Sequence, residues 1–166
     1  DAVCNWFLKT SGIPDEKGRA GRFPGRTEAE SLALEGYVAE EVAPWEAASG
    51  ARAVRCAAPR CAATFTFTGA PGWYDVVVQY FDLNNGASRY RLHLGEQLAD
   101  QWIADDTFPT RRIDAHSSTR RVIKGLPLRP GDRLRIEGLP DGGEGAPMDY
   151  LEVRPAGVAA PVAAVR

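Results

Sequence analysis

The fold class of this 166-residue chain is decided by the stretch Thr64-Phe65-Thr66-Phe67-Thr68-Gly69-Ala70-Pro71-Gly72-Trp73-Tyr74-Asp75-Val76-Val77-Val78. Over residues 64–68, phenylalanines alternate with threonines, so the rings share one face of a strand and the hydroxyls share the other. Residues 69–72 have the composition of a turn. Residues 73–81 then predict a central strand whose three valines are buried on both faces. This pattern indicates antiparallel β-structure.

The same kind of pattern continues on both sides of this stretch. We predict further strands over residues 28–34, 36–42, 51–56, 61–68, 88–94, 97–103, 119–126, 132–138 and 148–154, and we expect 51–56 and 61–68 to form a hairpin. In residues 88–94 the apolar side chains lie on one side, and Arg89, Arg91 and His93 lie on the other, solvated side. Many short strands separated by turn residues predict an all-β fold, an antiparallel β-sandwich or jelly roll.

Composition and charge exclude several classes of function. The formal net charge is −2 and the arginines are scattered among acids, so the sequence contains no cluster of basic residues that indicates nucleic-acid binding. No apolar run is long enough to span a membrane, and the chain does not begin like a signal peptide. We therefore expect no nucleic-acid partner and no membrane insertion.

The chain divides into three parts by composition. Residues 27–155 hold the strand pattern and predict one β-sandwich module, and residues 156–166 form an Ala-, Val- and Pro-rich tail. Residues 1–26 combine a short apolar segment with a charged, Gly-rich stretch. Two interpretations stay open for them: the tail of a preceding domain followed by a linker, or an arm that packs on the sandwich through Trp6 and Phe7.

Acidic residues stand at both ends of the strand pattern. Glu28 and Glu30 are two positions apart in the first predicted strand and therefore project from one face, and Asp149 begins the last predicted strand. If these strands lie side by side, the three carboxylates converge, and carboxylate oxygens favour a hard cation such as calcium. The alternative is three separate solvated acids.

The cysteines bear on the compartment in which the chain folds. Cys56 and Cys61 flank a plausible turn, and two strands leaving it would place the thiols within reach of a disulfide. The alternative is a pair of small buried hydrophobes. A disulfide would imply an oxidising compartment, whereas Cys4 has no obvious partner.

The sequence offers little for catalysis. It contains neither a G-x-S-x-G elbow nor an H-E-x-x-H motif. Asp105 and Asp106 are adjacent, and adjacent residues of an extended chain point in opposite directions, so they would not flank one bond. We therefore expect this chain to be no enzyme by itself.

Four motifs in order resemble carbohydrate-binding modules of families 6 and 35. They are Thr27-Glu28-Ala29-Glu30, Gly72-Trp73-Tyr74-Asp75-Val76-Val77-Val78, Leu128-Arg129-Pro130-Gly131-Asp132 and Met148-Asp149-Tyr150-Leu151. The resemblance implies a β-sandwich with a structural calcium held by Glu28, Glu30, Asp149 and backbone carbonyls near Ser49 and Gly50. The segment Asp1-Ala2-Val3-Cys4-Asn5-Trp6-Phe7-Leu8 also resembles the chain upstream of such modules in some bacterial α-glucuronidases.

In the family that the chain resembles, sugars bind to loops at one end of the sandwich. Sugar rings stack on aromatic side chains, and a uronic acid also suits arginine, which pairs with its carboxylate. The candidates in the matching loops, with one tryptophan outside them, are Trp45, Asn84, Asn85, Phe108, Arg111, Arg112, His116, Asp141 and Glu144. The long loop lacks the tryptophan of many relatives, whereas Trp102 alternates with Gln101 and is expected to pack in the core.

The leading hypothesis is a non-catalytic module that binds a uronic-acid-bearing plant polysaccharide such as glucuronoxylan and is attached to a parent catalytic domain. The alternative is a structural docking or dimerisation domain of an α-glucuronidase-like enzyme without sugar binding of its own. With the disulfide and the resemblance, either implies a secreted or periplasmic bacterial protein.

Overall fold

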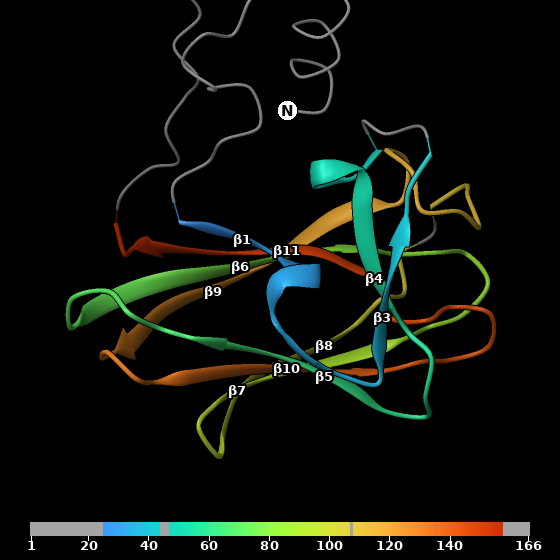
Figure 1. The fold of residues 1–166 in the computed structure, drawn as a ribbon. Coiled ribbons are helices and arrows are strands. Elements are labelled where there is room, and N and C mark those ends of the chain that lie inside the picture. Colours follow the sequence, from blue (N-terminus) through green and yellow to red (C-terminus); the bar gives the residue numbers. More distant parts are fainter. Residues whose placement is uncertain (1–24, 44–46, 107, 158–166) are drawn as a thin grey trace, which may run out of the picture.

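A computed structural model describes residues 25–43, 47–106 and 108–157 of the chain. Two antiparallel sheets pack face to face and form a β-sandwich (Figure 1), which confirms the predicted fold class. Within the described residues, no helix is long and apolar enough to cross a membrane.

The first sheet has the strand order β3-β4-β11-β6-β9, and β1 pairs with β11 beside this path. Its strands are β1 (Arg26–Glu28), β3 (Tyr37–Glu41), β4 (Arg52–Cys56), β6 (Gly72–Phe81), β9 (Ser118–Leu128) and β11 (Met148–Pro155). The second sheet has the order β2-β5-β10-β7-β8. Its strands are β2 (Ala33–Glu35), β5 (Cys61–Thr66), β7 (Arg89–Leu94), β8 (Gln97–Ile103) and β10 (Arg133–Leu139). The strand β6 is long and flanked by β11 and β9, as its valine run predicted.

The core lies between the two sheets. Alternate residues of the facing strands are buried there, and the run Val76, Val77 and Val78 is at most 2 % exposed. Tyr90 stacks on Trp102 with ring centroids 5.2 Å apart, and Trp102 is buried as the sequence predicted. Such aromatic pairs contribute about 0.5–1.5 kcal/mol beyond the burial of their area.

Two local predictions are wrong. Residues 28–34 do not form one strand: β1 ends at Glu28, a 3₁₀ turn η1 (Ala29–Ser31) follows, and β2 then joins the other sheet. Residues 51–56 and 61–68 do not form a hairpin, because β4 lies in the first sheet and β5 in the second. In both places the chain crosses between layers, which the alternation of polar and apolar residues along each strand cannot reveal.

A third correction concerns His93, which the Arg-bearing face of β7 predicted to be solvated. Its side chain is only 22 % exposed, and its Nε2 lies 3.8 Å from Glu137 Oε2 of β10. The neighbouring strand partly covers this imidazole, because His93 lies opposite the long side chain of Arg135.

Three connections cross from one sheet to the other at the same end of the sandwich (Figure 1). They join β6 to β7 (residues 82–88), β8 to β9 (residues 104–106 and 108–117) and β10 to β11 (residues 140–147). We call this group the loop end. The antiparallel order of the strands therefore gathers the loops in which the sequence analysis placed most of its ligand-binding candidates.

Candidate functional site

The pairing of β1 with β11 brings the predicted carboxylates to one place. Glu28 lies in β1, Asp149 in β11, and Glu30 in the turn η1. Ser49 joins two of them: its backbone N–H donates to Asp149 Oδ1 at 2.9 Å, and its hydroxyl donates to Glu28 Oε1 at 2.8 Å. We call Glu28, Glu30 and Asp149 the carboxylate clasp. Glu30 reaches it from a 3₁₀ turn and not, as predicted, from the strand that holds Glu28.

Burial and mutual repulsion disfavour the ionised carboxylates of the clasp, whereas the nearby guanidinium of Arg26 favours them. Burial raises the pKa of the Asp149 carboxyl to about 7 against the hydrogen bond from Ser49, and the carboxylates of Glu28 and Glu30 add to this rise. Burial also raises the pKa of Glu28, with a further contribution from Glu30. Asp149 is only 4 % exposed, so water stabilises its ionised form poorly. At neutral pH these acids repel one another in a partly dry site.

Two oxygens of the clasp fit a cation. Glu28 Oε2 and Glu30 Oε2 are buried and have no hydrogen-bond partner among the described residues. Unpaired carboxylate oxygens of this kind are the donors that calcium takes. No three Asp, Glu, His or Cys side chains of the described ranges lie in the arrangement of a formed metal centre, however. The donor set therefore fits calcium chemically, and the ion itself stays a proposal.

The backbone beside the clasp is held in an uncommon conformation. The 3₁₀ turn η3 (Ser49–Ala51) contains Gly50 with φ 63° and Ala51 with φ 61°. Alanine rarely adopts a positive φ, and such strain persists only where the surroundings hold it. The hydrogen bonds of Ser49 to the clasp and the bond from the Val42 N–H to the Ala51 carbonyl hold it here.

The loop end is cross-linked by backbone hydrogen bonds. The N–H of Asp82 donates to the Ser117 carbonyl and that of Asn84 to the Thr110 carbonyl, each at 2.9 Å. These two bonds tie residues 82–88 to the β8–β9 connection. The N–H of Gly143 donates to the Asn85 carbonyl at 2.9 Å, which ties the same residues to the β10–β11 connection. The loop between β6 and β7 is thus held from both sides.

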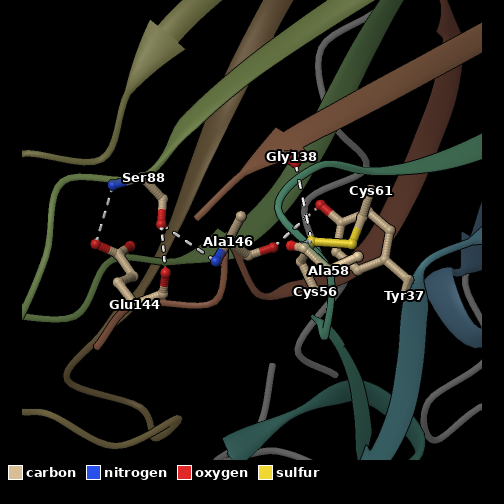
Figure 2. Close-up of a disulfide and its surroundings, with 8 residues drawn as sticks. All are labelled: Tyr37, Cys56, Ala58, Cys61, Ser88, Gly138, Glu144 and Ala146. Carbon is tan, nitrogen blue, oxygen red and sulfur yellow. Dashed lines mark hydrogen bonds between the residues drawn. A yellow bond between two sulfur atoms is a disulfide. The ribbon is translucent and has the colours of Figure 1, made fainter. Parts of the chain in front are cut away.

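Glu144 lies at the centre of this arrangement. It is 1 % exposed, and its carboxylate accepts the N–H groups of Leu83 at 3.4 Å and of Ser88 at 3.3 Å. The Ser88 hydroxyl donates to the Glu144 carbonyl at 2.9 Å and accepts the Ala146 N–H at 3.2 Å (Figure 2). Burial raises the pKa of Glu144 to about 7 against these two backbone donors, and the carboxylate of Asp82 contributes. Through these hydrogen bonds, Glu144 connects the loop between β6 and β7 to the β10–β11 connection.

The predicted disulfide between Cys56 and Cys61 is formed, with the two Cα atoms 5.6 Å apart. It joins β4 of the first sheet to β5 of the second (Figure 2). Nearby, the Tyr37 hydroxyl donates to the Ala146 carbonyl at 3.1 Å, and the Cys56 N–H donates to the Gly145 carbonyl at 2.7 Å. The residues around the disulfide therefore contact the β10–β11 connection, which contains Glu144.

The β8–β9 connection presents the predicted cationic side chains to solvent. Asp114 organises it: Oδ2 accepts the Thr110 hydroxyl at 2.9 Å, and Oδ1 accepts the His116 N–H at 2.8 Å. The Arg112 N–H in turn donates to Thr110 Oγ1 at 3.1 Å. The side chains of Arg111, Arg112 and His116 are exposed on this braced loop. A loop fixed in this way can hold cationic groups ready for an anionic ligand.

The remaining predicted ligand residues differ in accessibility. Asn84 and Asp141 are exposed at the loop end, and Asn85 and Phe108 are half-buried. Asp141 already accepts the Ala87 N–H through Oδ2 at 3.1 Å. Trp45 lies outside the described residues. The structure thus brings Asn84, Asn85 and Asp141 together with the β8–β9 connection, while Glu144 is enclosed beneath them.

Sequence reasoning missed the residues that close the loop end. Ser88 binds Glu144 and Ala146 from the last position of the loop between β6 and β7, and a single serine gives no signal of such a role. Gly86 lies in the same loop, and its composition of Asn and Gly indicates only a turn. A Cβ at this position would overlap the Asp141 carbonyl oxygen, so glycine is required by the close approach of two loops and not by its φ.

Comparison with curated proteins shows similarity to one part of a longer enzyme. The chain is 39 % identical over 166 residues to α-glucuronidase A of Aspergillus tubingensis, a match covering 95 % of this chain and 20 % of that protein. It is 41 % identical over 165 residues to the probable α-glucuronidase A of Aspergillus terreus, with the same coverage. The chain thus spans about one fifth of the length of the curated relatives it matches. These relatives are fungal, so they do not support the bacterial origin that the resemblance implied.

Comparison with solved structures shows the fold. A family 35 carbohydrate-binding module from Clostridium thermocellum superposes with a TM-score of 0.60 at 14 % identity, covering 79 % of this chain and 98 % of the module. The family 35 module-containing β-(1,4)-mannanase of Podospora anserina gives a TM-score of 0.59 at 17 % identity, covering 82 % of this chain and 28 % of the enzyme. No family model matches the sequence. The chain therefore has the sandwich fold of these modules and is homologous to a segment of α-glucuronidase A.

Proposed function

We propose that this chain is a non-catalytic carbohydrate-binding module that binds uronic-acid-bearing plant polysaccharide at its loop end. The observation that carries the proposal is the braced β8–β9 connection, which presents Arg111, Arg112 and His116 to solvent beside Asn84. Arginine pairs with a carboxylate through two parallel hydrogen bonds, and an amide can bind sugar hydroxyls. The similarity to α-glucuronidase A supports a uronic acid as the recognised group, and it supports a glycoside hydrolase as the parent enzyme.

The test is titration calorimetry of the full chain with glucuronic acid and with glucose, its uncharged counterpart, in calcium buffer. We expect the chain to bind the uronate and to bind glucose at least tenfold more weakly, because only the uronate pairs with Arg111 and Arg112. The variant Arg111→Ala/Arg112→Ala should lose the preference. Arg120→Ala/Lys124→Ala removes two exposed charges from β9 and is the matched control. Equal affinity for the two sugars, or the absence of heat with both, would refute the proposal.

We propose further that calcium stabilises the module through the carboxylate clasp. Glu28, Glu30 and Asp149 would hold the ion, together with backbone carbonyls near Gly50. When bound, calcium would neutralise the carboxylates and join β1 to β11, so its binding energy would add to folding stability. The buried unpaired oxygens of Glu28 and Glu30 support this role. The disulfide supports folding in an oxidising compartment, such as that of a secreted protein.

A second candidate function is docking on a parent catalytic domain or dimerisation without sugar binding. Trp73 favours it, because this side chain is 65 % exposed at the start of β6. The Ala156 N–H donates to the Trp73 carbonyl at 2.9 Å, so the backbone of Trp73 lies beside the residue that follows β11. Sedimentation of the chain and of Trp73→Ser tests for self-association. A monomer in both cases, together with uronate binding, would exclude dimerisation as the main role.

A further inference from the structure

The outer face of the second sheet carries an array of arginines. The core-facing residues of β7 and β10 are buried, so the alternate residues point away from the core. In the register of these strands, Arg89 lies opposite Leu139, Arg91 opposite Glu137, and His93 opposite Arg135. Arg133 continues the row on β10. We call Arg89, Arg91, Arg133 and Arg135 the arginine face.

The acids on this face neutralise only part of its charge. Arg135 pairs with Glu35 of β2 at 2.6 Å and lies 3.7 Å from Glu137. Within the part of the chain that the structure describes, Arg89, Arg91 and Arg133 have no ion-pair partner within 4.0 Å. Arg133 also contributes to the lowered pKa of Glu35, but the face still carries four arginines against the two acids Glu35 and Glu137, in a chain with a net charge of −2.

The arginine face is continuous with the loop end. Arg89 is the first residue of β7, directly after the loop of residues 82–88, and Leu139 directly precedes residues 140–147. Residues two apart on a strand are separated by about 6.7 Å, and neighbouring strands by about 4.8 Å. The arginine face therefore extends from the candidate sugar site along β7 and β10, and its successive arginines suit a polymer that carries carboxylates at intervals.

We propose that the arginine face binds the chain of a uronic-acid-bearing polysaccharide that is held at the loop end, and so raises the affinity for polymer above that for a single sugar. The inference rests on the ligand class of the proposed function. Arginine is suited to this task because each guanidinium can pair with a carboxylate through two hydrogen bonds. A second contact on one polymer strengthens binding by effective concentration.

Other occupants fit the face less well. A protein interface requires an apolar or aromatic centre, whereas the centre of this face holds Arg91, Arg135 and Glu137. The exposed aliphatic side chains Leu98 and Ile103 lie at its β8 edge, at 44 % and 46 % exposure. A symmetric dimer would place the arginines of one copy against those of the other, which like charges oppose.

The test compares polymeric glucuronoxylan with free glucuronic acid as probes of the full chain. The variant Arg89→Glu/Arg133→Glu reverses two exposed charges of the face, and Arg120→Glu/Lys124→Glu makes the same charge change on β9 of the other sheet. We expect the face variant to bind glucuronoxylan about tenfold more weakly or worse at low salt, because charge-assisted hydrogen bonds are lost. Its affinity for glucuronic acid should not change, and the control variant should bind like the parent.

Salt and a neutral polymer complete the experiment. The difference between parent and face variant should shrink as sodium chloride rises toward about 1 M, where the screening length falls to about 3 Å. Unchanged glucuronoxylan binding in the face variant would refute the proposal, as would an equal loss of binding to unsubstituted xylan. A dimer in sedimentation that the face variant abolishes would reassign the face to a second copy. If the loop end does not bind a uronic acid, the parent will show no binding of glucuronic acid. The two proposals are therefore refuted by different results.

Discussion

The carboxylate clasp predicts that Asp149→Asn stabilises the calcium-free protein at neutral and alkaline pH. The Asp149 carboxyl has a pKa of about 7 in the folded chain against an ordinary value of 3.8. Between these values the folded chain binds a proton that the unfolded chain does not, so stability falls as pH rises from about 4 to about 7. Above pH 7 the full cost of the buried charge is present, and asparagine, which does not ionise, avoids it.

The magnitude follows from the shift in pKa. A difference of about 3 units corresponds to about 4 kcal/mol at about 1.36 kcal/mol per unit. Asp149 is 4 % exposed, so solvent screens little of this energy. Asparagine can still accept the Ser49 N–H through its amide oxygen, and that hydrogen bond is kept. For a chain of this size, about 4 kcal/mol raises the melting temperature by about 10 °C.

Calcium should remove most of the variant's advantage. An ion at a concentration of about 1,000 times its dissociation constant stabilises the parent by about 4.1 kcal/mol, which matches the cost of the buried charge, and the variant, which lacks one ligand charge, gains less. Protons compete with calcium for the carboxylates, so the effect of calcium should weaken from pH 8 to pH 5.

The assay is calorimetric melting at pH 5, 6.5 and 8 in EGTA and in calcium chloride. Burial also raises the pKa of Glu144 to about 7, so this residue makes the stability of the parent fall with rising pH as well. The difference in melting temperature between parent and variant therefore isolates the contribution of Asp149. Glu96→Gln removes an exposed acid between β7 and β8 and is the matched control. If Asp149→Asn melts below the parent in EGTA at pH 8, or if calcium raises both melting temperatures equally, the reasoning is wrong.

Two further predictions concern the disulfide between the sheets and the close packing of the loop end. Replacing Cys56 and Cys61 together by serine should cost about 2 kcal/mol in free energy of unfolding, the chain-entropy value for so short a loop, and reductant should act equally on the parent in a denaturant titration. Gly86→Ala should lower stability more than Gly143→Ala, because the new Cβ overlaps the backbone carbonyl of Asp141 in the first case and a flexible asparagine side chain in the second. Equal urea midpoints for the two alanine variants would contradict the close approach of the loops.

Much of the fold could be predicted because the signals are local. Alternation in residues 64–68 and 88–94 assigns each side chain to a face, and nine of the ten predicted strands lie close to their predicted ranges. The wrong element was residues 28–34, where the apolar positions continue through a 3₁₀ turn. An amphipathic pattern of this length is compatible with a strand or with two short strands in different sheets, because both bury every second side chain.

For the candidate sites, too, some features follow from local sequence and others depend on how the strands pair. The sequence alone indicates which acids and arginines are present, that Glu28 and Asp149 stand in the first and last strands, and that loops with turn residues separate the strands. The folded arrangement of the strands was needed to show that Cys56 and Cys61 join two sheets, that Glu144 is enclosed by Leu83 and Ser88, and that arginines line one face. These outcomes depend on which strands pair and in what register, and pairing is set by contacts between residues far apart in the chain, which local patterns of polarity do not encode.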